Sequence, residues 1–253
     1  MSRIDLVMPP QTTNRAGRAE ARGRHLALSP AAPAREMRRE ASERAIRAVN
    51  VVIALVALVL LAPLMVLIAV AVKLTSRGPV FYTQTRVGLD RRGTAPNDGN
   101  HRRARDLGGS IFTIYKFRTM YVNAEHLSGA VWATKEDPRV TAVGRFLRQY
   151  RLDELPQLLN VIKGDMNIVG PRPERPSIFL QLREDITGYH LRQRTRPGIT
   201  GLAQINQHYD VCLDDVRRKL EYDLAYIERR SLLEDLKIMI KTVPVILFRR
   251  GGW

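Results

Sequence analysis

The chain has 253 residues, 45% of them hydrophobic, which suffices for one domain of ordinary size with a real core, plus a tail. The chain has one cysteine, Cys212, which excludes an intramolecular disulfide and a cysteine-based zinc cluster. A single cysteine fits a reducing compartment, and we expect Cys212 to be a buried, unreactive thiol. The net charge of +16 is spread along the chain, because residues 1–48 contribute only +5, and it suits anionic lipid, a nucleotide diphosphate or nucleic acid.

The N-terminal part is predicted to be a tail followed by a membrane helix. Residues 1–33 are rich in Arg, Ala, Pro and Ser without an apolar period, so we expect a disordered, basic, cytoplasmic tail. From 34 to 76 the pattern is helical, and Val51 to Val72 contains 22 uncharged, apolar residues. A straight helix of that length reaches roughly 33 Å, enough to cross a hydrocarbon core of about 30 Å. The run begins too far along the chain for a cleavable signal peptide, and its basic flanks favour a lipid surface as the anionic partner.

Two details of this apolar run argue against a simple spanning helix. Pro63 lies in its middle, removes a helix hydrogen bond and predicts a kink. Basic residues flank both ends, and positive flanks prefer the cytoplasmic side, so both ends favour the same side. A bent segment that enters and leaves one leaflet satisfies this, but kinked spanning helices are common. On the residues alone, both topologies stay open and length favours the spanning one.

The rest of the chain predicts an α+β, mainly helical domain with a small β-hairpin. The segments 80–87 and 111–118 alternate apolar and polar residues, as paired strands do. Their long connection, 88–110, is rich in Gly, Arg, Asn and Asp and is expected to be a mobile loop, or else a substrate lid. Helical patterns follow at 123–128, 141–150, 154–163, 177–192 and 213–248.

The strongest candidate for chemistry is the adjacent acidic pair Asp153 and Glu154, within Arg151-Leu-Asp-Glu-Leu-Pro-Gln157. Asp153 suits a helix N-cap, where helix amides would keep both carboxylates ionised. Arg145, Arg148 and Arg151 recur every three residues and could cradle a diphosphate. Asp153 could then attack phosphorus, and Glu154 could hold a divalent cation. The plainer alternatives are that both acids only cap a helix, and that Pro171-Arg172-Pro173 and Lys116-Phe117-Arg118 are ordinary surface features.

Several ordered motifs extend this site and carry a resemblance to a known family. The chain resembles the monotopic phosphoglycosyl transferases, bacterial sugar transferases that act on polyprenyl phosphate, over roughly residues 44–251. The resemblance rests on the apolar segment with Pro63 and on these motifs: Gly78-Pro-Val-Phe-Tyr-Thr-Gln84, Lys116-Phe-Arg-Thr-Met120, Asp137-Pro-Arg-Val-Thr141, Leu152-Asp-Glu-Leu-Pro-Gln157, Gly164-Asp-Met166 through Pro173, Pro197-Gly-Ile-Thr-Gly-Leu-Ala-Gln204, Tyr222-Asp223 and Asp235-Leu-Lys237.

The resemblance implies transfer of a sugar 1-phosphate from a UDP-sugar to undecaprenyl phosphate with release of UMP, which initiates a surface glycan. It implies that Asp153 is the nucleophile of a covalent sugar-phosphate intermediate, that Glu154 binds Mg²⁺, and that the turn from Pro171 to Pro173 contacts the nucleotide. Substrate contacts are assigned with it to Lys116, Arg118, Arg145, Arg148, Arg151, Arg172 and Gln204.

The family also implies a re-entrant helix broken at Pro63, at the bacterial inner membrane, with a catalytic domain (77–253) on the cytoplasmic face. Two departures bear on this: Ala62 stands where Ser often precedes that proline, and the turn after Gln204 differs, which bears on sugar choice. The extra N-terminal bundle of the family's large subgroup has no counterpart here, so we expect a small-form member, which could be a homodimer and would not bind nucleic acid. The C-terminal helices around Lys237 and Phe248 are expected either on the membrane surface or against the core. The competing function is a membrane-anchored basic protein that binds anionic lipid or nucleic acid without catalysis.

Overall fold

The computed structural model describes residues 31–90, 108–122, 124, 137–207 and 212–248, with side chains from Ala41 onward. The chain divides into two units, Met1–Ala41 and Ser42–Trp253, and all contacts given below lie within the second. The predicted basic tail, most of the connection 88–110 and the predicted helix 123–128 lie outside the described residues, so those predictions stay open.

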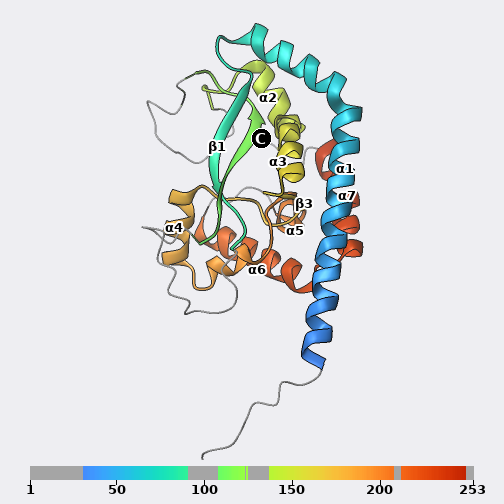
Figure 1. The fold of residues 1–253 in the computed structure, drawn as a ribbon. Coiled ribbons are helices and arrows are strands. Elements are labelled where there is room, and N and C mark those ends of the chain that lie inside the picture. Colours follow the sequence, from blue (N-terminus) through green and yellow to red (C-terminus); the bar gives the residue numbers. More distant parts are fainter. Residues whose placement is uncertain (1–30, 91–107, 123, 125–136, 208–211, 249–253) are drawn as a thin grey trace, which may run out of the picture. The chain divides into compact units, whose positions relative to one another are not determined.

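The predicted membrane helix is present as α1, Ala31–Thr75, with Pro63 inside it. Figure 1 shows α1, coloured blue to teal, as one helix that bends toward its C-terminal end. A proline in a helix interior is a sufficient cause of such a bend, because it removes a hydrogen bond and clashes with the preceding turn. Within the described residues, the part from Ala41 to Thr75 is the one helix long and apolar enough to cross a membrane, judged by length and composition.

One face of α1 packs on the protein and the other is exposed. Ile46 and Ala54 before Pro63, and Ile68 and Val72 after it, are all buried. Large apolar side chains on the opposite side are at least half exposed: Val52, Val56, Val59, Leu60, Val66, Leu67 and Val70. A continuous exposed apolar face of this kind marks contact with lipid or with another apolar surface.

The predicted hairpin is confirmed. Strands β1 (Phe81–Val87) and β2 (Ile111–Phe117) pair antiparallel, with Phe81 opposite Phe117 and Val87 opposite Ile111. Phe112 and Ile114 on one face of β2 pack with Ala54 of α1 in a shared core cluster. Helix α1 and the hairpin are therefore parts of one folded core.

The remaining elements are short, and the predicted mainly helical α+β class is confirmed. In chain order they are α2 (Ala142–Gln149), the 3-10 helix η1 (Leu152–Gln157), α3 (Leu158–Lys163), β3 (Asn167–Val169), α4 (Pro176–Asp185), the 3-10 helix η2 (Tyr189–Arg194), β4 (Gly198–Thr200), α5 (Leu202–Asn206), α6 (Leu213–Arg229) and α7 (Leu232–Leu247). Strands β3 and β4 form a small parallel pair that the sequence patterns did not predict.

Two predicted helices are each divided in the structure. The segment 213–248 forms α6 and α7, because Ser231 starts a new helix by accepting a hydrogen bond from Glu234 N on its side chain. The segment 177–192 ends as an α-helix at Asp185, and Gly188 then adopts a left-handed backbone before η2.

The expectation of a buried Cys212 is wrong. The thiol is exposed, at the N-cap of α6, where Cys212 Sγ lies 3.4 Å from Asp215 Oδ2. Helix α7 has one buried side and one exposed side. Asp235 and Ile238 are buried, while Leu236, Ile240 and Leu247 are exposed. It packs by one side and presents an apolar face by the other.

Candidate active site

Asp153 and Glu154 lie in the 3-10 turn η1, and the prediction that Asp153 caps an α-helix is wrong. Helix α2 ends at Gln149, Arg151 adopts a left-handed backbone with φ of 53°, and α3 begins only at Leu158. Pro156 lies inside η1, between the acidic pair and the start of α3. The carboxylates therefore depend on side chains, and not on a helix N-terminus, for their charge balance.

Three cations surround the Glu154 carboxylate, which is nearly buried. Lys116 Nζ donates to Glu154 Oε1 at 3.0 Å. Arg172 contacts both oxygens, with Nη2 at 2.6 Å from Oε1 and Nη1 at 3.3 Å from Oε2. Arg151 Nη1 lies 4.0 Å from Oε1. The structure thus unites four predicted site residues from three distant segments of the chain.

Asp153 shares this environment but is less tightly paired. Its side chain is about 10% exposed, and within the described residues its ion-pair partner is Lys116, whose Nζ lies 3.9 Å from Asp153 Oδ2. That separation is beyond hydrogen-bond distance. The Asp153 carboxylate oxygens are thus less strongly paired with protein donors than those of Glu154.

The two carboxyl groups differ in acidity. Burial alone would raise the pKa of Glu154, but Arg172, Lys116 and Arg151 outweigh it and hold that pKa well below its usual range. Burial raises the pKa of Asp153 against the pull of Lys116, and the neighbouring Glu154 charge acts in the same direction as burial. Asp153 is thereby the more basic of the two, which favours it as the nucleophile, while Glu154 stays a fixed anion.

The turn that carries Arg172 is held along its whole backbone. Four successive carbonyls each accept one hydrogen bond: Pro171 O from Gly198 N at 3.0 Å, Arg172 O from Arg192 Nη2 at 3.0 Å, Pro173 O from Arg86 Nη1 at 2.9 Å, and Glu174 O from Val87 N at 2.9 Å. A turn fixed this way presents the Arg172 guanidinium to Glu154 at little cost in conformational freedom.

The Arg192 guanidinium, which is 1% exposed, organises a buried ionic cluster behind this turn. Its Nε and Nη2 donate to Asp223 Oδ2 at 3.0 and 2.6 Å, and its Nη1 donates to Glu174 Oε1 at 3.1 Å. Lys219 Nζ donates to the same Glu174 oxygen at 2.8 Å. The role of Arg192 was not predicted from the sequence, because polar and charged residues surround it in the chain and nothing local distinguishes it from them.

Three predicted arginines lie elsewhere. The Arg118 guanidinium donates to Arg77 O at 2.8 Å and to Ser76 O at 2.7 Å, so it joins the end of β2 to the end of α1. Arg145 is exposed on α2. Arg148 Nε donates to Thr119 Oγ1 at 2.9 Å, although its charge still lowers the pKa of Asp153. The prediction that Arg145, Arg148 and Arg151 share one helix face is wrong. Helix α2 ends at Gln149, and Arg151 lies beyond it with a left-handed backbone.

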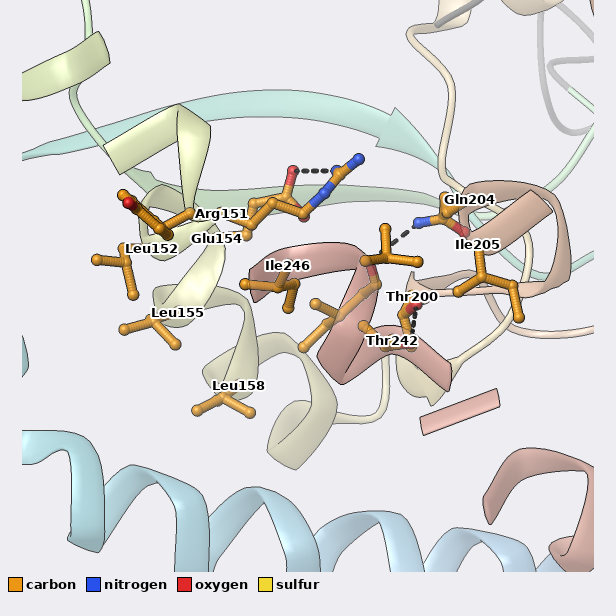
Figure 2. Close-up of a pocket in the computed structure, with 13 residues that line it drawn as sticks. Arg151, Leu152, Glu154, Leu155, Leu158, Thr200, Gln204, Ile205, Thr242 and Ile246 are labelled. Carbon is orange, nitrogen blue, oxygen red and sulfur yellow. Dashed lines mark hydrogen bonds and ion pairs between the residues drawn. The ribbon is translucent and has the colours of Figure 1, made fainter. Parts of the chain in front are cut away.

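A cavity of about 230 Å³ opens beside Glu154, between η1, β4, α5 and α7. Figure 2 shows Arg151 and Glu154 at one end of it and Thr200, Thr242 and Gln204 at the other. Aliphatic side chains form most of its wall. Gln204 lines it, with Nε2 donating to Ile199 O at 3.0 Å, so this predicted residue lies at the cavity and not at the cations.

A magnesium ion could be held by the acidic pair only with help from the substrate. Within the described residues, no cluster of three or more His, Cys, Asp or Glu could hold a metal. Mg²⁺ is, however, commonly bound by one or two carboxylates together with substrate phosphates, and Asp153 and Glu154 supply that set. Because Lys116 and Arg172 already contact Glu154, the ion would share this carboxylate with them.

Comparison with known proteins identifies the family of this chain. A family profile described as bacterial sugar transferase matches residues 41–249. The chain is 42% identical over 191 residues to the "UDP-N-acetylgalactosamine-undecaprenyl-phosphate N-acetylgalactosaminephosphotransferase" of Aeromonas hydrophila, covering 76% of this chain and 41% of the relative. It is 44% identical over 184 residues to the "UDP-glucose:undecaprenyl-phosphate glucose-1-phosphate transferase" of Klebsiella pneumoniae, covering 72% and 36%.

A relative of more similar length is the "Exopolysaccharide production protein ExoY" of Sinorhizobium fredii, which is 37% identical over 206 residues, covering 76% of this chain and 80% of the relative. The chain spans less than half the length of the first two relatives. The profile match covers most of this sequence, including both carboxylates and the turn at Arg172. The chain belongs to the bacterial sugar transferase family.

Proposed function

We propose that this protein transfers a sugar 1-phosphate from a UDP-sugar to undecaprenyl phosphate, releasing UMP and starting the assembly of a surface glycan. The observation that carries the proposal is the buried acidic pair, in which three cations contact Glu154 while Asp153 keeps an oxygen for attack. The names of the relatives support the acceptor and the transferred group.

In the first half-reaction an Asp153 carboxylate oxygen attacks the phosphorus that bears the sugar. The bond between that phosphorus and the bridging oxygen breaks, and the bridging oxygen leaves with the electron pair as part of UMP. An acyl phosphate that carries the sugar remains on Asp153. Burial, which raises the pKa of Asp153, makes this oxygen a stronger nucleophile than that of a free aspartate.

Lys116, Arg151 and Arg172 have the charge and position to bind the diphosphate. They balance Glu154 in the free protein, so no isolated cation must be buried before substrate arrives. When the diphosphate binds, these cations can turn from Glu154 to phosphate oxygens and stabilise the charge of the departing UMP. Bound Mg²⁺, held by Glu154 and Asp153, would neutralise further diphosphate charge.

In the second half-reaction a phosphate oxygen of undecaprenyl phosphate attacks the phosphorus of the acyl phosphate. The bond from that phosphorus to the Asp153 oxygen breaks, which restores the carboxylate and releases the lipid diphosphate sugar. One carboxylate thus serves both halves of the reaction, and the two substrates need not be bound together.

The packing of α1 supports a re-entrant placement at the cytoplasmic face of the inner membrane. Ile46 and Ala54 lie before Pro63 and Ile68 and Val72 lie after it, yet all four are buried in the same folded unit. If α1 spanned the bilayer, one of these arms would have to leave that unit. A bent helix that keeps both arms on one side also agrees with its basic flanks.

UMP release from a panel of UDP-sugars, in detergent with Mg²⁺, tests the reaction. We expect release with at least one donor and almost none from Asp153→Asn. Asp214→Asn is the matched control, because Asp214 is an exposed acid on α6 paired with Arg217, and it should keep full activity. Equal rates in both variants would remove Asp153 from the mechanism. Salt-dependent binding of lipid or nucleic acid without any turnover would favour the non-catalytic alternative.

Cysteine labelling tests the topology. The background must first be Cys212→Ser, because the native thiol is exposed and a serine can keep the N-cap of α6. Cysteines placed at Arg38 and at Arg91 should then react only with reagent on the cytoplasmic side. Reaction of either one from the outside would support a spanning helix.

A further inference from the structure

We infer that the cavity between η1, β4, α5 and α7 binds the first isoprenoid units of the lipid acceptor, with the acceptor phosphate at its Arg151 end. This inference rests on the proposed function and adds to it the place where one substrate binds. The family match identifies the fold, but it does not assign this cavity.

The wall of the cavity suits a branched hydrocarbon. Seven aliphatic side chains line it from four helices and one strand: Leu152, Leu155, Leu158, Ile199, Ile205, Val245 and Ile246. Apolar cavities of about 150 Å³ take up molecules as large as benzene. A volume of about 230 Å³ therefore accommodates at least one five-carbon isoprenoid unit.

The two threonine hydroxyls in the wall are already engaged with the protein. Thr200 Oγ1 and Thr242 Oγ1 lie 2.8 Å apart, and Thr242 Oγ1 also donates to Ile238 O at 2.7 Å. Gln204 donates to Ile199 O, and its buried Oε1 is an acceptor without a hydrogen-bond partner in the described part of the chain. A uracil, a ribose or a sugar would need several hydrogen bonds from this wall, which offers few, so the donor is the poorer occupant.

The charge at the Arg151 end matches a lipid phosphate. Arg151 and Glu154 line the same cavity as the aliphatic side chains, and Lys116 and Arg172 also contact Glu154. In Figure 2 the Arg151–Glu154 pair lies beside the strands, whereas Leu155, Leu158 and Ile246 lie on the side away from the strands. An amphipathic molecule with an anionic head and an apolar tail fits this division.

Helix α7 connects the cavity with exposed apolar surface. Val245 and Ile246 face the cavity, whereas Ile240, Val243 and Leu247 on the same helix are exposed. A long isoprenoid chain that leaves the cavity can therefore continue along an apolar surface without crossing water. A soluble nucleotide would gain nothing from that continuity.

The test fills the cavity from α7 with Ile246→Trp, beside Leu233→Trp as the matched control, because Leu233 is exposed on the first turn of the same helix and does not line the cavity. With the UDP-sugar alone, both variants should release one UMP per active site at the wild-type rate. With undecaprenyl phosphate added, transfer by Ile246→Trp should fall at least about tenfold while Leu233→Trp stays within about twofold of wild type. Ile205→Trp fills the cavity from α5 and should repeat the result if Ile246→Trp fails to fold.

Two results would overturn the inference. Loss of the single UMP turnover in folded Ile246→Trp would assign the cavity to the donor. Unchanged transfer by folded Ile246→Trp and Ile205→Trp would show that the acceptor does not enter it.

Photocrosslinking separates the inference from the proposed reaction. An isoprenyl phosphate with a diazirine near its phosphate end should label peptides that contain 152–158 or 242–246. Labelling there by a wild-type protein that never releases UMP would refute the reaction and keep the site. UMP release with labelling only elsewhere would refute the site and keep the reaction.

Discussion

Two clusters of charge in this fold contain similar residues, but their carboxylates are paired to different extents. Around Arg192, Asp223 and Glu174 are buried and directly hydrogen-bonded to cations, with Lys219 as a second partner for Glu174. Around Glu154, the neighbouring Asp153 lies 3.9 Å from Lys116. The cluster around Arg192, in which the carboxylates are fully paired, holds a backbone turn. In the cluster around Glu154, Asp153 is incompletely paired, which leaves one of its oxygens available to form a bond.

The two clusters are also mechanically connected. Arg192 holds the carbonyl of Arg172 from behind, and the Arg172 side chain reaches forward to Glu154. A change in the cluster around Arg192 should therefore lower stability more than activity. A change in the cluster around Glu154 should lower activity more than stability.

The largest expected effect is on activity, from Glu154→Gln. An amide keeps the shape but loses the charge that balances Lys116 and Arg172, and it is a poor magnesium ligand. We expect kcat/KM for UMP release to fall about a thousandfold, which is about 4 kcal/mol of transition-state stabilisation. The variant should lose less unfolding free energy than Asp223→Asn, because Lys116, Arg151 and Arg172 are 16%, 20% and 27% exposed and reach water, whereas Arg192 is 1% exposed. A loss of stability as large as that of Asp223→Asn would contradict the division between the clusters.

The next effect is on stability, from Asp223→Asn. This change leaves a buried guanidinium with half of its negative partners, which should cost about 3 kcal/mol of unfolding free energy. Urea unfolding in detergent measures it. The control is Asp214→Asn, which breaks an exposed pair with Arg217 and should cost less than about 1 kcal/mol. Equal losses of unfolding free energy in Asp223→Asn and Asp214→Asn would mean that the cluster around Arg192 does not stabilise the fold.

The smallest effect is a shift in pH dependence. Only ionised Asp153 can attack, so the single-turnover rate should fall as the pH drops through its pKa, which burial raises above the ordinary value. Lys116 lowers this pKa, so Lys116→Met should move the acid limb to higher pH. The Glu154 charge raises it, so Glu154→Gln should move the residual acid limb to lower pH. Stopped-flow or quenched-flow UMP release over pH distinguishes the two directions.

Local patterns predicted the regular elements well, because they depend on nearby residues. The alternation in 80–87 and 111–118 gave the β1–β2 hairpin, and the apolar run gave α1. The pattern could not predict that Arg151 turns left-handed or that Asp153 lies in a 3-10 turn, since tertiary contacts to Lys116 and Arg172 compete with helix capping there. Capping rules describe an isolated helix end.

The site was predicted in its residues more than in its arrangement. Asp153, Glu154, Lys116 and Arg172 meet as expected, but Arg118 joins β2 to α1 and Arg145 is exposed. Arg192 and Asp223 are 31 residues apart in the chain, and no periodicity links them. Long-range pairs of this kind depend on how helices pack, which a single sequence does not specify.

The central claim is that an Asp153 oxygen forms a bond to the phosphorus that carries the sugar. Incubation with the UDP-sugar in the absence of lipid acceptor, followed by rapid acid quench and peptide mass spectrometry, tests it directly. The account predicts a sugar-phosphate adduct on the peptide that contains Asp153, in amounts that match the UMP released, and its disappearance when undecaprenyl phosphate is added. Stoichiometric UMP release with the adduct on Glu154, on another residue or on none would contradict it.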